Sequence, residues 1–305
     1  MAKISVLMTV YNDRNEWLTM SIDSILNQTY TDFEFIIVND NPKDERICRI
    51  LSSYAERDSR IVLVVNENHG RVNALNVGVA VASGEYLAVM DGDDYAHPDR
   101  FEKELDYMEK NSCDMVSVFW ATMDENSEIT DEGRALRLSP ETVSESLRWG
   151  NMVLHTAWIA KMSVYRRLGG YRNVMHAEDY DFLLRARESG YRIGITPHIL
   201  ANVRVRKNSI STTNVLHQFI VLYYLAEHAK EIFELDPDKV NTYVDSKVTK
   251  KRNAAYIKAT EYIRIASKSG KVKMLMYVMK ALFTSRYAWK YILHTVHLRK
   301  IKRKG

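Results

Sequence analysis

The segment Tyr86-Leu-Ala-Val-Met-Asp-Gly-Asp-Asp94 indicates the fold, because a short apolar run ends in a turn that carries three carboxylates. A run of this length between turn residues is typical of a strand buried on both faces. Similar runs occupy 4–10, 33–38 and 61–65, with helical periodicity between them. Strands that alternate with helices predict an α/β protein with a mostly parallel sheet covered by helices on both faces.

Polar residues follow three of these strands. They form the clusters 9–13 (Thr-Val-Tyr-Asn-Asp), 39–40 (Asn-Asp) and 91–94 (Asp-Gly-Asp-Asp). In an open parallel sheet, ligands bind beyond the carboxyl ends of the strands. The three clusters therefore predict a single ligand-binding crevice at this edge of the sheet.

The carboxylates of Asp91, Asp93 and Asp94 are close enough in sequence to repel one another, and a cation would relieve that repulsion. Carboxylate oxygens suit Mg²⁺ or Mn²⁺, and a site with one or two protein carboxylates completes its coordination with phosphate oxygens. The alternative is an acidic turn that caps the next helix. The neighbouring clusters favour the metal.

Two residues of the other clusters are candidates for nucleoside binding. Asp40 can accept a hydrogen bond from a ring N–H of a base, or it can cap a helix that begins near Asp44. Tyr11 can stack on a base, or it can be an ordinary packing residue.

The second half of the chain adds further charged candidates. Glu178-Asp179 opens a predicted helix, where an acidic residue either stabilises the helix dipole or faces the crevice as a general base. Arg204 and Arg206 end the second of two short strands expected near 191–195 and 199–205, and they either clamp a pyrophosphate or are surface charges.

The order of several motifs resembles the family-2 glycosyltransferases of the GT-A fold, over about residues 4–211. The motifs are Ser5-Val-Leu-Met-Thr-Val-Tyr-Asn12, Ser24-Ile-Leu-Asn-Gln-Thr-Tyr30, Phe33-Glu-Phe-Ile-Ile-Val-Asn-Asp40, Asn68-His-Gly-Arg-Val-Asn-Ala-Leu-Asn76, Ala82-Ser-Gly-Glu-Tyr86, Asp91-Gly-Asp-Asp94 before Pro98, Gly169-Gly-Tyr171, Glu178-Asp-Tyr-Asp181 and Val203-Arg204. The chain departs from the family pattern at Thr9-Val10, at Asn41-Pro42 and at Arg206, where the family often has Pro, Gly-Ser and His.

The resemblance implies an inverting, metal-dependent transfer of a hexosyl or N-acetylhexosaminyl group from a nucleotide-diphosphate sugar. By matching position, Thr9, Tyr11 and Asp40 would contact the nucleoside, and Asp91 would lie by the ribose. The donor is expected to be a UDP-sugar.

Matching position also assigns the groups nearer the reaction. Asp93 would hold Mn²⁺ or Mg²⁺ on the diphosphate, and Arg204 would contact the donor phosphates. Asp179 would be the base that takes the proton of the acceptor hydroxyl.

The acceptor is expected to be a glycan or a lipid-linked glycan in cell-surface polysaccharide synthesis. His155 and Trp158 are candidate acceptor-binding residues, because they lie between the metal loop and the proposed base in sequence. His can hydrogen-bond to sugar hydroxyls and Trp can stack on a sugar ring, although Trp158 is equally suited to core packing.

Three other functions are compatible with parts of the sequence. A catalytically silent sugar-nucleotide-binding or scaffold protein would be free to lose Asp93 or Asp179, and both are present. A nucleotidyltransferase is expected to carry a Gly-rich basic loop after the first strand, which 9–14 does not provide. A nucleic-acid binder would leave the acidic crevice without a purpose, so no nucleic-acid partner is expected.

The charge divides the chain of 305 residues into two parts. Residues 1–246 carry a net charge of −12, whereas Lys247–Gly305 carries 17 Lys and Arg residues against the single acid Glu261. The predicted organisation is a catalytic domain over 1–214, with a nucleotide-sugar half (about 1–110) and an acceptor half (about 111–214), and a helical extension over 215–305 that is basic from 247.

The basic extension predicts attachment to an anionic membrane surface. From Lys271 onward, one amphipathic helix is expected, with an apolar face formed by Leu275, Val278, Leu282, Trp289, Ile292 and Val296. Lysines interrupt the apolar pattern, so no membrane-spanning helix is expected. The alternative is that this face packs on the catalytic domain or on a second subunit.

Only two cysteines are present and the first residues lack the pattern of a signal peptide, so a reducing compartment is the default. The expected location is cytoplasmic, at the inner face of the membrane.

Overall fold

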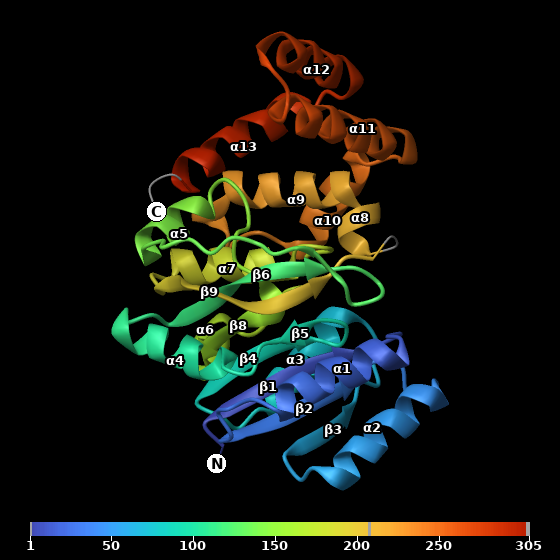
Figure 1. Ribbon diagram of the computed structural model, residues 1–305, viewed down its shortest axis with the longest axis vertical. Helices are drawn as coiled ribbons and strands as arrows, with labels where there is room; N and C mark the ends of the chain where they lie inside the picture. The colour runs from blue at the N-terminus through green and yellow to red at the C-terminus, as the bar shows by residue number, and fades with distance from the viewer. Residues whose placement is uncertain (1, 207–208, 303–305) are drawn as a thin grey trace.

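A computed structural model describes residues 2–206 and 209–302 (Figure 1). One mixed sheet has the strand order β3-β2-β1-β4-β8-β6-β9-β5, and β7 pairs with β6. The strands are β1 Ile4–Val10, β2 Phe33–Asn39, β3 Ile61–Val65, β4 Tyr86–Asp91, β5 Tyr95–Ala96, β6 Met115–Met123, β7 Ile129–Asp131, β8 Trp158–Lys161 and β9 Ile193–Arg204. This is the predicted α/β architecture.

The first four strands are parallel, as the sequence predicts, and their register places the polar clusters together. Thr9 of β1 lies beside Val38 of β2 on one side and Asp91 of β4 on the other. The clusters that follow β1, β2 and β4 therefore emerge side by side at one edge of the sheet.

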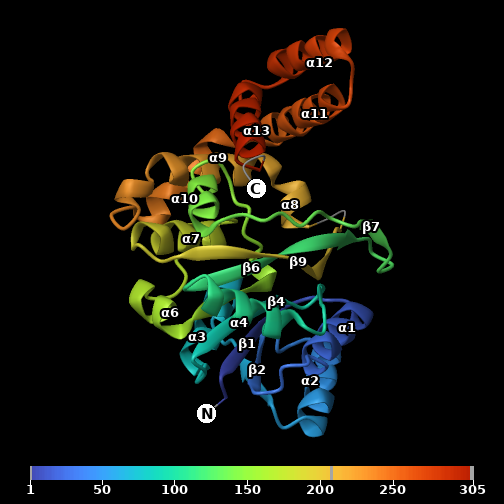
Figure 2. The ribbon, with the colours of Figure 1, turned by 60° about the vertical axis from the view of Figure 1, so that its left-hand side comes forward.

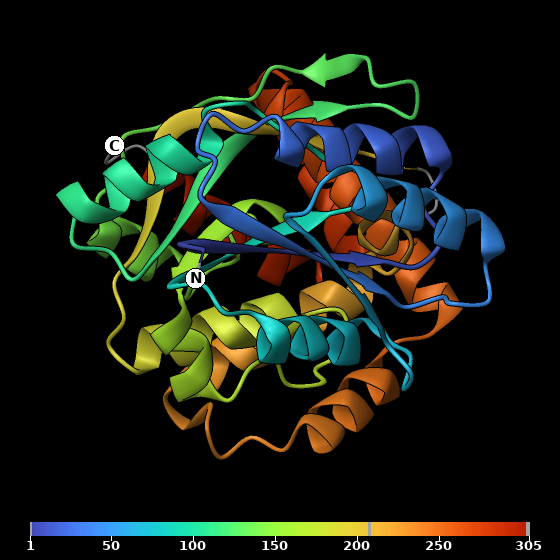
Figure 3. The same cartoon turned by 90° about the horizontal axis from the view of Figure 1, so that it is seen from below.

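Helices cover both faces of the sheet (Figure 3). One set of helices lies on each face. The apolar side chains of Ile4, Val6 and Met8 pack with the first set, and Leu7 packs with the second. The first set is α1 Asn15–Leu26, α2 Glu45–Arg57 and α4 Arg100–Lys110, and the second includes α3 Arg71–Val81, α6 Met162–Leu168 and α7 Glu178–Glu188. Each buried strand thus contributes to two cores, as expected for a parallel sheet between helical layers.

The second half of the sheet differs from the sequence-based prediction in two respects. The expected pair of short strands within 191–205 is instead the single strand β9, Ile193–Arg204. The extra residues of β9 around Pro197 are accommodated by register shifts against β6, opposite Val118 to Trp120. The expected loop at 155–158 is one turn of 3₁₀-helix, His155–Ala157, that leads directly into β8.

The remaining helices include α5 Pro140–Ser146, α8 Ile210–Thr213, α9 Val215–Glu227, α10 Pro237–Lys247, α11 Lys250–Ser267, α12 Lys271–Thr284 and α13 Ala288–Lys302. Figure 2 shows α11 and α12 projecting from the body of the molecule. The expected single helix from Lys271 is wrong, because Ser285 has an extended backbone and separates α12 from α13. Arg303 and Lys304 of the basic tail lie outside the described residues.

The helices after residue 214 share a core with the sheet and with the helices that precede them. Leu216, Val221 and Tyr256 are fully buried members of the cluster that also contains Leu7 of β1 and Phe182 of α7. The division at residue 214 stays a prediction about organisation, and in the structure apolar packing crosses it.

Candidate active site

The loop after β4 holds its carboxylates in place through bonds to distant segments. The backbone N–H of Asp91 donates to Thr156 Oγ1 at 2.8 Å, and Asp94 Oδ1 accepts from the backbone N–H of Arg204 at 2.8 Å. The next helix, α4, has Asp99 as its N-cap residue. The loop is therefore not the N-cap of that helix, which was the alternative explanation for its acidic residues.

Burial and mutual repulsion act on the carboxylates of this loop. The pKa of Asp93 is raised to about 6, chiefly by burial; Arg206 opposes the shift, and the charges of Asp91 and Asp13 contribute to it. Burial also raises the pKa of Asp94 well above its usual value. Asp13, which follows β1, was not a candidate from the sequence, yet burial raises its pKa too and Asp91 adds to the effect.

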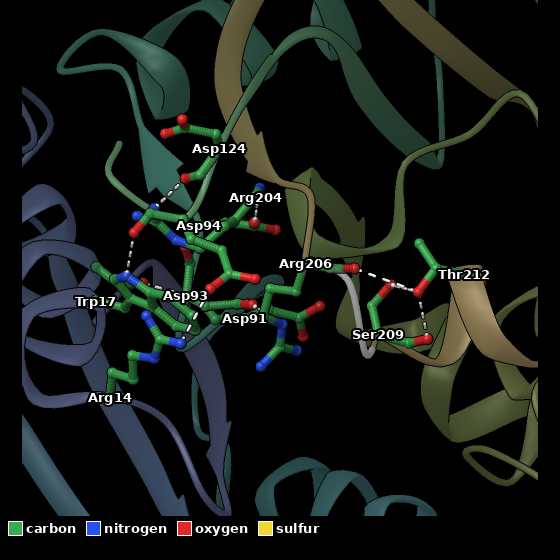
Figure 4. A network of polar contacts seen from close by, with 12 residues as sticks. Arg14, Trp17, Asp91, Asp93, Asp94, Asp124, Arg204, Arg206, Ser209 and Thr212 are labelled. Atoms are coloured by element: carbon green, nitrogen blue, oxygen red, sulfur yellow. Dashed lines mark hydrogen bonds and ion pairs between the residues drawn. The ribbon is translucent and has the colours of Figure 1, made fainter. Parts of the chain in front are cut away.

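The carboxylates of the described part of this loop do not form a complete metal site by themselves. Arg206 Nε lies 3.0 Å from Asp93 Oδ2, so a positive charge already compensates the carboxylate on which the metal prediction rests (Figure 4). Within residues 2–206 and 209–302, no three His, Cys, Asp or Glu side chains are grouped closely enough to hold a metal ion by themselves. The residues suit a cation that takes one protein carboxylate and completes its shell with phosphate oxygens.

Arg204 lies behind the loop. It is buried, and its guanidinium donates to the carbonyl oxygens of Asp93 (3.0 Å) and Asp124 (2.6 Å) and to Ser127 Oγ (3.0 Å). These bonds tie the end of β9 to the carboxylate loop. Direct contact of Arg204 with a donor phosphate stays a prediction, and Arg206 is the arginine that reaches the Asp93 carboxylate.

Asp40 is buried at the end of β2 and organises the loop before α3. Its carboxylate accepts from the backbone N–H of Gly70 at 2.9 Å and from Asn66 Nδ2 at 2.6 Å. Asp44, and not Asp40, caps α2. Gly70 has a φ of 101°, a conformation that favours glycine. The capping explanation for Asp40 is therefore wrong, and its contact with a base stays a prediction.

The residues that follow β1 are open to a ligand. Tyr11 is 61% exposed, so ordinary core packing does not explain it. Thr9 is half-buried at the end of β1 beside Asp91.

Arg71, the first residue of α3, connects the loop after β4 to the start of α7. Its Nη2 lies 3.2 Å from Asp91 Oδ1, and its Nε lies 2.8 Å from Glu178 Oε1. Although burial opposes ionisation of Asp91, Arg71 holds the pKa of Asp91 below its usual value. The sequence contained Arg71 only as part of a motif, and nothing in the local pattern identified its two partners.

Asp179 lies on the first turn of α7, next to the residue that Arg71 binds. Its Oδ2 accepts from Asn151 Nδ2 at 3.1 Å. Burial raises the pKa of Asp179 to about 7, and the neighbouring charge of Glu178 adds to the shift. The N-cap residue of α7 is Ala177. A half-buried carboxylate with this pKa is suited to exchange a proton near neutral pH.

The two acceptor candidates lie in the interior. Trp158 is fully buried, its Nε1 donates to Tyr165 Oη at 2.8 Å, and its ring packs against Phe182. The prediction that Trp158 stacks on an acceptor sugar is wrong, because no face of the ring is accessible. His155 is 8% exposed and lies 3.0 Å from Tyr171 Oη. Burial and Arg71 lower the pKa of His155 to about 4, so it is neutral at physiological pH.

The fold defines an α/β protein of the GT-A type, with polar clusters and a carboxylate loop at the ends of parallel strands. The sequence model of the family described as "Glycosyl transferase family 2" matches residues 5–168. The chain belongs to this family, and it is a glycosyltransferase.

Individual relatives agree with the family match. An uncharacterized glycosyltransferase of Methanocaldococcus jannaschii is 32% identical over 223 residues, which cover 72% of this chain and 77% of the relative. The O-antigen biosynthesis glycosyltransferase WbnJ of Escherichia coli is 31% identical, over 75% of this chain and 89% of its own.

Solved structures show the same fold. The mannosyltransferase PcManGT from Pyrobaculum calidifontis, in complex with GDP-Man and Mn²⁺, superposes with a TM-score of 0.61 at 17% identity, covering 97% of this chain and 86% of its own.

Proposed function

We propose that the protein transfers a hexosyl or N-acetylhexosaminyl group from a nucleoside diphosphate sugar, with UDP as the expected nucleotide, to a hydroxyl of a glycan acceptor. We further propose that the transfer inverts the anomeric carbon and serves cell-surface polysaccharide synthesis. The observation that supports the proposal is the contact of Arg71 with both Asp91 and Glu178, because it brings the carboxylate loop close to the start of α7, where Asp179 lies.

Asp179 is the group proposed to act on the acceptor. Its carboxylate takes the proton of the attacking hydroxyl, and Asn151 orients it through the bond to Oδ2. A single displacement with one base on the face opposite the leaving group inverts configuration, so a second carboxylate is not required. Glu178 is less suited to this role, because Arg71 occupies its Oε1.

The donor is proposed to occupy the crevice at the ends of β1, β2 and β4. Thr9 and Tyr11 flank the nucleoside, Asp40 faces the base, and Asp91 faces the ribose. A Mn²⁺ or Mg²⁺ ion held by Asp93 would neutralise the charge that the leaving diphosphate gains. Arg206 lies close enough to Asp93 to contribute a second positive charge to the same diphosphate.

Similar proteins support parts of this proposal. WbnJ is described as acting in O-antigen biosynthesis, which is the synthesis of a surface polysaccharide. The structurally similar mannosyltransferase is described in complex with GDP-Man and Mn²⁺.

A donor panel tests the activity. UDP-, GDP- and dTDP-sugars are incubated with the protein in the presence of Mn²⁺ or of a chelator, and release of the nucleoside diphosphate is measured. We expect release from a UDP-sugar that requires the metal. Donor binding without release from any sugar would instead support a catalytically silent binding protein.

The C-terminal helices are proposed to hold the enzyme on an anionic membrane surface. On α12, Val272 and Phe283 are each 85% exposed and Leu275 is 63% exposed, beside Lys271, Lys273 and Lys280. Exposed apolar side chains flanked by lysines suit the interface of anionic lipid, where each basic residue adds about 1 kcal/mol. None of the described helices is both long enough and apolar enough to span a bilayer. Such attachment would place the enzyme beside lipid-linked glycans at the inner face of the membrane.

Replacing the apolar residues of α12 with serine is expected to weaken vesicle binding. The triple variant V272S/L275S/F283S removes exposed side chains without disturbing the core. Co-sedimentation with vesicles that contain anionic phospholipid should fall at least tenfold. Val65→Ser is the matched control, because Val65 is 53% exposed on β3 in the other half of the molecule. Equal binding of the triple variant and the control would refute the attachment, and dimerisation lost only in the triple variant would show that α12 binds a second subunit.

A further inference from the structure

A cavity of about 500 Å³ lies beside the proposed base. Its wall comes from the loop 149–151, from the start of α7, from α9 and from α13. Figures 1 and 2 show α13 running alongside α9, far in sequence from the catalytic loops. Asp179 lines the cavity, and so does Asn151, which donates to its carboxylate.

The lining combines aromatic rings with amide and hydroxyl groups. Phe219 and Tyr223 come from α9, and Tyr291 comes from α13. Trp149 also lines the cavity, with its ring stacked on His297 of α13 at a centroid distance of 3.8 Å. Gln218 and Thr295 supply polar groups. Aromatic faces that pack on a ring and a few placed polar groups that bond to hydroxyls suit a sugar, and the volume lies in the range of small-ligand sites.

The cavity is separate from the donor crevice. Among the described residues that line it, none belongs to the clusters at the ends of β1, β2 and β4. Its lining has one arginine, Arg299, and the acid Asp179, which is too little positive charge for a diphosphate. Asp179 therefore lies between the proposed donor site, on the side of Arg71, and the aromatic cavity that it lines.

We propose that this cavity binds the terminal sugar of the acceptor glycan, so that the C-terminal helix α13 forms part of the acceptor site. This assignment rests on the proposed role of Asp179 as the base. It replaces the acceptor role of Trp158, and it places specificity for the acceptor in residues beyond 214. A hydroxyl of the bound sugar meets the Asp179 carboxylate, and the remainder of the glycan leaves through the open side of the cavity.

The test introduces a larger side chain on α9 that occupies part of the cavity. Leu222 lines the cavity and is half-buried, so Leu222→Trp reduces the space available to a sugar. Leu293→Trp is the matched control: Leu293 lies on α13, is 39% exposed and does not line the cavity. Calorimetry in the presence of UDP and Mn²⁺ measures the binding of methyl and octyl glycosides of glucose, galactose, mannose and their N-acetylamino forms. A second assay measures metal-dependent release of nucleoside diphosphate with the glycosides present as acceptors.

We expect at least one glycoside to bind the wild type and Leu293→Trp equally, and to bind Leu222→Trp at least tenfold more weakly. UDP with Mn²⁺, titrated by calorimetry without glycoside, should bind both variants as tightly as it binds the wild type, which shows that the donor site is intact. Absence of glycoside binding to the wild type, or binding that survives Leu222→Trp, would overturn the assignment. Absence of donor turnover in the wild type, with the glycosides present as acceptors, would instead refute the proposed function.

Discussion

Asp179→Asn is expected to lower the rate of sugar transfer by about 10²- to 10⁴-fold, the range for loss of a positioned general base. The amide preserves the size of the side chain but cannot accept the proton of the acceptor hydroxyl. Donor affinity should stay unchanged, because Asp179 lies on the acceptor side of Arg71. Initial transfer rates and equilibrium binding of the donor measure the two effects.

The same variant distinguishes two roles of Asp179, a general base and a residue that only stabilises its helix. Burial raises the pKa of Asp179 from about 3.8 in the unfolded chain to about 7 in the folded protein. Ionisation of this carboxyl therefore lowers the stability of the folded state as pH rises above about 3.8, and the loss is complete above pH 7. Asp179→Asn should therefore be at least as stable as the wild type at pH 8. A variant that loses stability but transfers sugar normally would contradict the assignment.

The pH dependence follows from the same shift. The carboxylate must be ionised to accept a proton, so kcat of the wild type should rise as pH increases through about 7. The residual rate of Asp179→Asn should lack this rise. Glu178→Gln is the matched control, because it removes the partner of Arg71 but leaves the proposed base, and it should retain a pH-dependent rate.

Asp93→Asn is expected to abolish the stimulation of donor turnover by Mn²⁺ and to lower kcat/KM for the donor by at least about 10²-fold, the scale for loss of one charge-stabilising group. The amide cannot supply the charged ligand that joins the protein to a cation on the diphosphate. Titration of the donor at several Mn²⁺ concentrations measures the effect.

Asp94→Asn is the control for the same loop. Burial raises the pKa of Asp94 well above its usual value, and its Oδ1 accepts a hydrogen bond from the backbone N–H of Arg204. An asparagine can accept the same hydrogen bond, so this variant should retain the response to Mn²⁺. An equal loss of metal response in both variants would show that the loop acts through its shape and not through Asp93.

The sequence predicts the donor half of the fold well, because its signals are local. Each strand from β1 to β4 is a short apolar run, and each polar cluster follows its strand directly. A parallel sheet then brings the ends together without further information, so Asp40, Asp91 and Asp93 are found at one edge.

The acceptor half is less predictable, because its structure depends on contacts between distant segments. β8 has four residues and is antiparallel to its neighbours, so no alternation in its sequence distinguishes it from a loop. The core position of Trp158 depends on its contacts with Tyr165 and Phe182, which the local sequence pattern does not indicate. The two partners of Arg71 are separated from it by 20 and 107 positions.

The packing across residue 214 has a consequence for synthesis of the chain. A ribosome that has released β1 to β4 has already released the apolar residues that α1 and α2 cover, so this face can close early. The opposite core includes Tyr256 of α11, and Tyr291 of α13 packs against it. It stays incomplete until α13 has emerged. An enzyme truncated within the final helices would thus retain a folded donor half beside an exposed apolar surface, and aggregation would precede any loss that is specific to catalysis.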